Sequence, residues 1–144
     1  MPTIAMYPGS FDPVTNGHLD IIKRSSRMFD KVIVAVLVNS AKTPLFTVEE
    51  RVAMLRDACK NIPNVEIDSF NGLTVTFAKQ KGATVMVRGL RAVTDFENEI
   101  QLAHTNFAMM PEIETVFLAT AIKWSYLSST IVREAAHYGQ DVSR

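Results

Sequence analysis

Residues 31–38 read Lys-Val-Ile-Val-Ala-Val-Leu-Val, and this stretch decides the fold class. Seven apolar residues follow one another from Val32 to Val38, without the alternation of a strand that has one wet face. Such a run is typical of a strand in a parallel sheet that helices cover on both faces. A membrane-spanning helix needs about 20 apolar residues, so this run is far too short to cross a bilayer.

Outward from this run, short β-rich segments alternate with longer helical patterns. We predict strands at Thr3–Tyr7, Lys31–Val38, Val65–Ser69, Thr84–Arg88 and Thr115–Ala119. The alternation indicates an α/β fold, namely a Rossmann-like, doubly wound five-stranded parallel sheet with right-handed crossovers and helices on both faces. The chain has 144 residues, of which 47% are hydrophobic, so we expect one domain over residues 1–144.

Helix starts are predicted from capping patterns and apolar periodicity. We expect helices over about Gly17–Met28 with Asn16 as the N-cap, from Thr47, over about Thr74–Lys81, from Thr94 to near Met109, and from Ser128 or Ser129 to about His137. Thr47-Val48-Glu49-Glu50 and Thr94-Asp95-Phe96-Glu97 both fit a capping box. In the helix from Thr94, the stripe expected to face the core consists of Phe96, Ile100, Ala103 and Phe107.

Composition excludes several classes of protein. Lys plus Arg and Asp plus Glu number 15 each, so the formal net charge is zero, which argues against a nucleic-acid binder. Cys59 is the only cysteine, so no intrachain disulfide forms, and its apolar helical neighbours predict a buried core residue. No signal peptide or membrane segment is visible, so we expect a cytoplasmic protein without a membrane partner.

In a sheet of this kind, ligands bind beyond the carboxyl ends of the strands. The first strand is followed by residues 8–18, Pro-Gly-Ser-Phe-Asp-Pro-Val-Thr-Asn-Gly-His. Gly9 and Gly17 would let a ligand approach the backbone, and the helix start favours a phosphate. His18 would lie in the first helical turn, and Ser10 adds a hydroxyl. The residues alone leave a phosphate site and an ordinary loop with a surface histidine about equally supported.

Cations follow two other strands. Lys42 comes after the second strand, where it is either a solvated lysine or a phosphate ligand. Arg88 and Arg91 flank Gly89 at the end of the fourth strand. A charge at the end of an apolar strand needs a partner, which is either a ligand phosphate or a carboxylate such as Asp95 or Glu99.

Two further segments carry polar groups. Asp95, Glu99, Leu102 and Asn106 form a second stripe on the helix from Thr94, which is either a ligand wall or a solvated flank, and the pattern alone slightly favours the flank. After the fifth strand, Ser128, Ser129 and Thr130 offer hydroxyls at a helix start. Trp124 is interpreted either as a residue of the hydrophobic core, which is the default, or as a contact of a nucleotide base.

Several motifs are absent. The sequence shows no zinc-ligand spacing, no Walker motif and no G-x-G-x-x-G fingerprint. We expect no protein metal site, and we interpret His104 and His137 as structural.

Two of these segments resemble the signatures of a known superfamily. Thr15-Asn16-Gly17-His18 resembles the (H/T)-x-G-H signature of nucleotidylyltransferases, and Ser128-Ser129-Thr130-Ile131-Val132-Arg133 resembles their second signature, S-S-T-x-x-R. Residues 7–18, 88–91 and 95–97 resemble one family within this superfamily, the bacterial phosphopantetheine adenylyltransferases. The resemblance to that family runs from Thr3 to Val142. Position 10 is Ser where many relatives have Thr. The chain ends at Arg144, whereas many relatives continue with a further helical segment.

The resemblance implies an activity and a set of residues. The expected enzyme transfers AMP from ATP to 4′-phosphopantetheine with Mg²⁺, giving dephospho-coenzyme A and pyrophosphate, as a homohexamer with coenzyme A as a feedback ligand. By position, His18 is the catalytic residue that stabilises the transition state. The ATP-binding residues would be Ser10, Phe11, Gly17, His18, Gly89, Leu90, Arg91, Glu99, Trp124, Ser125, Tyr126, Leu127, Ser128, Ser129 and Thr130. The residues for the pantetheine substrate would be Ser10, Lys42, Thr74, Arg88, Leu102 and Asn106.

The residue inventory agrees with this chemistry. A phosphate nucleophile is already anionic at neutral pH, and the chain offers no convincing nucleophile–base pair. We therefore expect direct in-line attack, without a covalent enzyme intermediate, that depends on positioning and charge stabilisation. The alternatives are an adenylyltransferase for another small phosphate, such as nicotinate mononucleotide or glycerol 3-phosphate, and a non-catalytic nucleotide-sensing domain on the same fold. A class I aminoacyl-tRNA synthetase fragment is disfavoured, because no K-M-S-K-S loop is present.

Overall fold

The computed structural model describes residues 2–38, 45–90 and 93–119, the last range without the side chains of residues 93–96. The strands are β1 (Ile4–Gly9), β2 (Lys31–Leu37), β3 (Val65–Phe70), β4 (Val85–Leu90) and β5 (Glu114–Ala119). The helices are α1 (Asn16–Met28), α2 (Val48–Ala58), α3 (Thr74–Gln80) and α4 (Val93–Met109). The predictions for Lys42, Arg91, residues 124–130 and the last helix lie outside the described residues.

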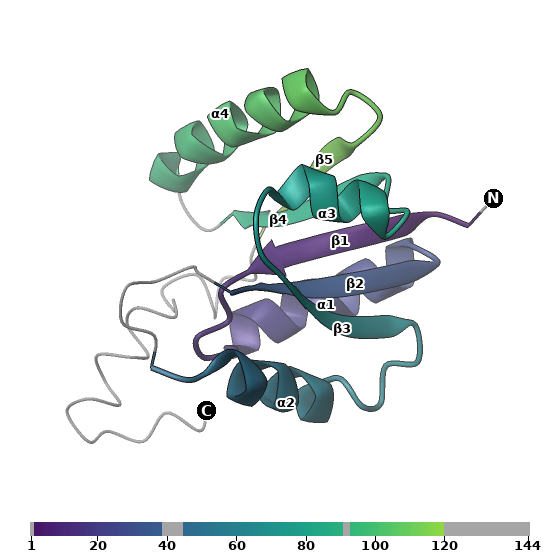
Figure 1. The fold of residues 1–144 in the computed structure, drawn as a ribbon, viewed down its shortest axis with the longest axis vertical. Coiled ribbons are helices and arrows are strands. Elements are labelled where there is room, and N and C mark those ends of the chain that lie inside the picture. The colour runs from purple at the N-terminus through teal and green to yellow at the C-terminus, as the bar shows by residue number, and fades with distance from the viewer. Residues whose placement is uncertain (1, 39–44, 91–92, 120–144) are drawn as a thin grey trace.

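The strands form one five-stranded sheet in the order β3-β2-β1-β4-β5, and every pairing is parallel. The chain runs from β1 outward to β3, returns to place β4 on the other side of β1, and continues to β5 (Figure 1). The strand order therefore reverses between β1 and β4, which is where such sheets bind ligands. The predicted doubly wound α/β fold is confirmed.

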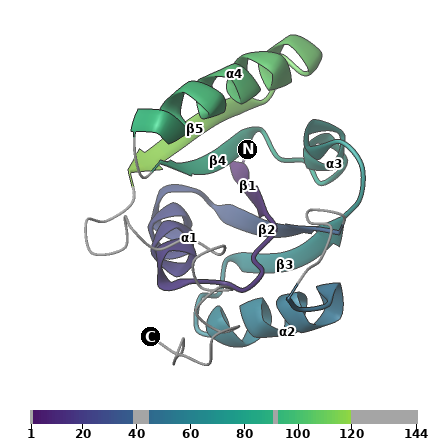
Figure 2. The ribbon, with the colours of Figure 1, turned by 90° about the vertical axis from the view of Figure 1, so that its left-hand side faces the viewer.

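The helices cover both faces of the sheet. Figure 2 shows α1 and α2 on one side of the strands and α3 and α4 on the other. Strand β2 explains why, since Val32, Val34 and Val36 belong to the core under α1 and α2, while Ile33 and Ala35 belong to the core under α3. Its continuous apolar run was therefore interpreted correctly as a strand with two buried faces.

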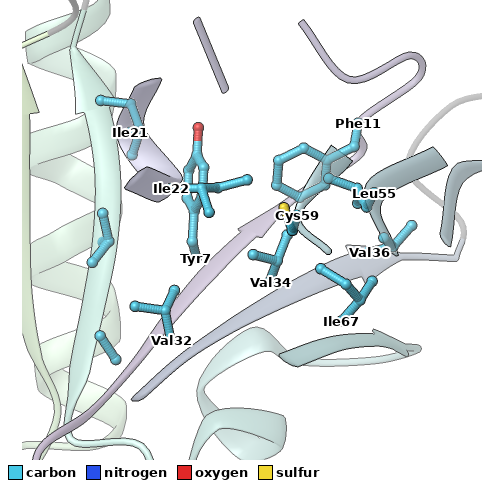
Figure 3. Packing of buried hydrophobic residues seen from close by; sticks show 12 residues of the cluster. Tyr7, Phe11, Ile21, Ile22, Val32, Val34, Val36, Leu55, Cys59 and Ile67 are labelled. Carbon is cyan, nitrogen blue, oxygen red and sulfur yellow. The ribbon is translucent and has the colours of Figure 1, made fainter. Parts of the chain in front are cut away.

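The first of these cores lies nearest the site described below. Figure 3 shows it between the sheet, α1 and α2, with Tyr7 of β1 and Phe11 of the following loop among its members. Cys59 is 5% exposed within it, as predicted for a buried cysteine. In the described part of the chain, no helix combines the length and the apolar character that crossing a bilayer requires.

Two helix starts are fixed by capping boxes. In α2, the Oγ1 atom of Thr47 accepts from the Glu50 N–H at 3.1 Å, and Glu50 accepts from the Thr47 N–H at 2.9 Å, as predicted. In α1, the prediction of Asn16 as N-cap is wrong, because Thr15 is the N-cap. The hydroxyl of Thr15 can reach the third helical N–H, whereas Asn16 already lies in the helix. The predicted box at Thr94 involves undescribed side chains.

The face that α4 presents to the sheet is predicted only in part, since Ile100 and Ala103 of the predicted core stripe are partly buried. Phe107 was expected in the core but is 49% exposed, and Asn106 is 8% exposed. Glu99 lies two turns before Asn106 on the same face, and it forms an ion pair with Arg88 of β4. Glu99 and Asn106 therefore lie on the inward side of α4, together with the partly buried Ala103. The second stripe of this helix was interpreted as a solvent-exposed flank. This interpretation is wrong for Glu99 and Asn106 and holds for Leu102, which is 42% exposed.

Candidate active site at the carboxyl edge of the sheet

The loop after β1 is held in an unusual conformation at Phe11. The φ angle of Phe11 is 49°, a left-handed value that is uncommon for a bulky residue. Its ring is buried and packs edge-on against Tyr7 and His18, with centroid distances of 5.3 and 4.9 Å. The close approach of this ring explains Gly9, because a Cβ atom there would lie 3.1 Å from Phe11 Cε2.

His18 lies in the first turn of α1 and takes part in the capping of its own helix. Its backbone N–H donates to Thr15 Oγ1 at 3.2 Å, and its Nδ1 atom accepts from the Thr15 N–H at 2.9 Å. A ring nitrogen that accepts from a backbone N–H carries no proton itself, so the neutral imidazole holds its proton on Nε2. His18 is therefore set up as a hydrogen-bond donor through Nε2, beside a helix start that favours anions.

Arg88 is held at the end of β4 by three contacts. Its Nε donates to Glu99 Oε1 at 2.9 Å, its Nη2 donates to Glu99 Oε2 at 3.3 Å, and its Nη1 donates to the carbonyl oxygen of Pro8 at 3.3 Å. The sequence predicted either a ligand phosphate or a carboxylate as the partner of Arg88. In the structure, Arg88 has a carboxylate partner, Glu99. The bond to Pro8 joins the end of β4 to the end of β1 across the point where the strand order reverses.

Asp12 and Arg51 fasten the same loop to the start of α2. Asp12 is fully buried, and its two carboxylate oxygens accept from the N–H groups of Phe46 and Leu45 at 2.8 Å each. Arg51 is 1% exposed and donates to the carbonyl oxygens of Ser10, Leu37 and Thr47 at 2.9, 3.3 and 3.4 Å. Sequence reasoning missed both residues. The Asp-Pro turn was a weak signal for Asp12, and nothing distinguished Arg51 from the charged residues around it.

The other described residues of the predicted site lie along the same edge of the sheet or on α4. Ser10 directly follows β1, and Gly17 is buried in the first turn of α1. Gly89 and Leu90 end β4 beside Leu118 and Ala119 of β5. Thr74 is the first residue of α3, which follows the carboxyl end of β3. Leu102 and Asn106 belong to α4, with the first exposed and the second buried.

Two carboxylates among the described residues of this edge already have partners. Asp12 accepts backbone N–H groups, and Glu99 pairs with Arg88. Over residues 2–38, 45–90 and 93–119, no group of three or more His, Cys, Asp or Glu side chains is placed to hold a metal ion.

A glycine–histidine helix start, Gly17 and His18, thus follows the first strand of a five-stranded parallel sheet at the point where the strand order reverses. Residues 6–135 match the family described as cytidylyltransferase-like, and the chain is a nucleotidyltransferase, as its curated relatives are. Phosphopantetheine adenylyltransferase from Lachnoclostridium phytofermentans is 58% identical over 141 residues, covering 98% of this chain and 86% of the relative. The relative of the same name from Synechocystis is 58% identical, covering 96% of this chain and 87% of the relative. The chain belongs to the phosphopantetheine adenylyltransferase family.

Solved structures share the fold at lower identity. A putative nicotinate-nucleotide adenylyltransferase from Vibrio parahaemolyticus superposes with a TM-score of 0.73 at 21% identity, covering 99% of this chain and 92% of that one. The lipopolysaccharide core biosynthesis protein from Thermoplasma volcanium superposes with a TM-score of 0.61 at 19% identity, covering 84% of this chain and 98% of that one. At these identities, the likeness concerns the fold alone.

Proposed function

We propose that this chain transfers the adenylyl group of ATP to 4′-phosphopantetheine, producing dephospho-coenzyme A and pyrophosphate for coenzyme A biosynthesis. The observation that carries the proposal is the hydrogen bond from the Thr15 N–H to Nδ1 of His18, which leaves the ring proton on Nε2 in a residue of the first turn of α1, where a helix start favours phosphate. The names of relatives that are 56–59% identical over nearly the whole chain support this choice of substrates.

The chemistry needs little from a general base. The phosphate of the acceptor is anionic at neutral pH, and it attacks the α-phosphorus of ATP in line while pyrophosphate leaves. Negative charge then develops on the α-phosphate oxygens, and His18 stabilises it by donating from Nε2. The N–H groups at the start of α1 act in the same direction.

Arg88 is suited to bind the phosphate of the acceptor. A guanidinium has five N–H groups, and three take part in the contacts with Glu99 and Pro8. Within the described residues, this leaves two that can face an anion. Because Glu99 fixes the guanidinium plane, Arg88 loses little conformational freedom when a phosphate binds.

The remaining expected residues complete the proposal. We assign ATP to Ser10, Phe11, Gly17, His18, Gly89, Leu90, Arg91, Glu99 and residues 124–130, and the acceptor to Ser10, Lys42, Thr74, Arg88, Leu102 and Asn106. Mg²⁺ would enter on the phosphates of ATP, as is common for this metal. A cytoplasmic homohexamer with coenzyme A as feedback ligand remains part of the proposal.

A panel of acceptors tests the substrate. Purified protein with ATP and Mg²⁺ is mixed with 4′-phosphopantetheine, nicotinate mononucleotide or glycerol 3-phosphate, and pyrophosphate release is followed. We expect release with 4′-phosphopantetheine and at least about a hundredfold lower kcat/KM with the others, because the acceptor site would hold more than the phosphate. Preference for another acceptor would reassign the substrate. ATP binding without release for any acceptor would instead indicate a nucleotide-sensing domain.

A further inference from the structure

The strained backbone at Phe11 points to residues that act on His18 from a distance. A left-handed φ of 49° is costly for phenylalanine, and it persists only where the surroundings impose it. Here the two neighbouring residues are both fastened. The carbonyl oxygen of Ser10 accepts a hydrogen bond from Arg51, and the carboxylate of Asp12 accepts hydrogen bonds from the N–H groups of Leu45 and Phe46.

The side chains that make these hydrogen bonds, Asp12 and Arg51, are both buried. Asp12 is fully buried and Arg51 is 1% exposed, so each charge depends on its hydrogen bonds in place of water. Their partners outside the loop lie at the end of β2 and at the start of α2, namely Leu37, Leu45, Phe46 and Thr47. The loop after β1 is thereby held against a neighbouring part of the sheet edge on both sides of Phe11.

The ring of Phe11 transmits this restraint to His18. The two rings meet edge-on at 4.9 Å with an interplanar angle of 71°, and Phe11 is only 1% exposed. A shift of the Phe11 backbone would therefore move the aromatic ring that packs against the imidazole of His18. We propose that Asp12 and Arg51 are positioning residues for His18, acting through Phe11, in the adenylyl transfer proposed above, on which this inference rests.

Two conservative variants test the proposal in the full chain. Asp12→Asn keeps the side-chain shape but replaces one acceptor oxygen with a donor, and Arg51→Lys keeps the charge but loses the planar fork. We expect each to lower kcat for pyrophosphate release by about 10–100-fold with KM for ATP nearly unchanged, because small misplacements near the chemistry have effects of this size. Arg56→Lys, at an exposed position of the same helix, is the matched control and should leave both constants unchanged.

A double-mutant cycle distinguishes a positioning role of Asp12 from a merely structural one. If Asp12 acts through His18, Asp12→Asn should lower turnover by less than about threefold in a His18→Ala background. Equal losses in the two backgrounds would overturn the proposal. Thermal unfolding checks that each variant is folded, and Arg51→Lys takes the place of Asp12→Asn if the latter does not fold.

A measurement in the absence of substrate tests the positioning role of Asp12 and Arg51 independently of the proposed enzymatic activity. The ring ¹⁵N signals of His18 in the wild-type chain should show a protonated Nε2 and an unprotonated Nδ1. We expect Asp12→Asn and Arg51→Lys to shift or broaden these signals and Arg56→Lys to leave them unchanged. Unchanged signals in both variants would refute the positioning role. Absence of pyrophosphate release from the wild type would refute the proposed function instead.

Discussion

The backbone N–H of Thr15 donates to Nδ1 of His18 over 2.9 Å, so the histidine stands where a capping box usually has a glutamate. One hydrogen bond thus completes the start of α1 and fixes the tautomer of the ring. Helix stability and the proposed catalysis depend on the same contact, and variants at the two residues should affect them to different extents.

Replacing His18 with alanine should lower kcat by about 10²–10³, because one preorganised donor to a developing oxyanion has effects of this size. ATP should still bind, since the other nucleotide contacts would remain. Steady-state kinetics and calorimetric titration with ATP measure the two quantities. His104→Ala, at an exposed position of α4, is the control. Turnover near the wild-type value in the His18 variant would remove that residue from the proposed mechanism.

Replacing Thr15 with valine removes the hydroxyl that caps α1 but keeps the N–H that His18 accepts. The free energy of unfolding should fall by about 0.5–2 kcal/mol, as is usual for lost N-caps, and urea denaturation measures it. Thr47→Val at the start of α2 should cost a similar amount. We expect only the Thr15 variant to lower kcat, and equal turnover in the two variants would contradict the coupling of the α1 cap to the site.

Replacing Arg88 with lysine keeps the charge but cannot reproduce the paired contacts with Glu99. KM for 4′-phosphopantetheine should rise about tenfold or more, corresponding to about 1.4 kcal/mol of binding, while KM for ATP changes little. The comparison is Arg27→Lys in the last turn of α1, an exposed position. A rise confined to the KM for ATP would place Arg88 at the nucleotide instead.

The cluster around Lys81 should make stability depend on pH. The hydrogen bond from Lys81 lowers the pKa of Glu66, and the hydrogen bond to Asp68 raises the pKa of Lys81. Burial alone would raise the pKa of Asp68, but hydrogen bonds from Lys81 and the Ser69 N–H outweigh it and lower that pKa. The carboxylates therefore stabilise the fold above their ordinary values of 4.5 and 3.8, and this contribution is lost as pH falls through the lowered values.

Because these groups are partly exposed, Lys81→Met should cost no more than about 1 kcal/mol at pH 7. The loss should shrink in acid, as the carboxyls protonate, and also above the ordinary lysine value of 10.5, as Lys81 loses its proton. Chemical denaturation at pH 3, 7 and 11 measures it. Lys60→Met, which breaks a far more exposed pair with Asp57, should cost less. A pH-independent loss at position 81 would indicate packing rather than charge.

The single cysteine should be unreactive in the folded chain. Burial raises the pKa of the Cys59 thiol, which leaves little thiolate at neutral pH, and the side chain is 5% exposed. Alkylation with iodoacetamide should therefore be slow under native conditions and fast in urea, as mass spectrometry can follow. Rapid native labelling would show that the packing around α2 opens readily.

Much of the fold was predictable because the decisive signals are local. The apolar run of β2 fixed a strand with two buried faces, and the Thr47 and Glu50 pair fixed the start of α2. The face of α4 was not predictable in the same way. Apolar periodicity placed Phe107 in the core, but Phe107 is exposed, whereas Asn106 and Glu99, which pairs with Arg88 11 residues away, lie on the inward side.

Part of the candidate site could be proposed from a sequence motif, whereas contacts that depend on burial could not. Residues 15–18 named His18 directly. Arg51 lies among Glu49, Glu50 and Arg56 in a helix that reads as charged and solvated, and only the folded chain brings it against the carbonyl oxygens of Ser10 and Leu37. A sequence pattern does not reveal which charged side chain meets buried carbonyl groups.

The bond from Arg88 to Pro8 joins residues that are 80 positions apart. During synthesis, β1 and its loop emerge long before β4, and until β4 arrives the flank of β1 away from β2 has no neighbour from this sheet. An unpaired strand flank invites association with other chains. A ribosome-bound fragment that stops before residue 85 should therefore aggregate more readily than one that includes β4, and it would also lack Arg88 and its bond to Pro8.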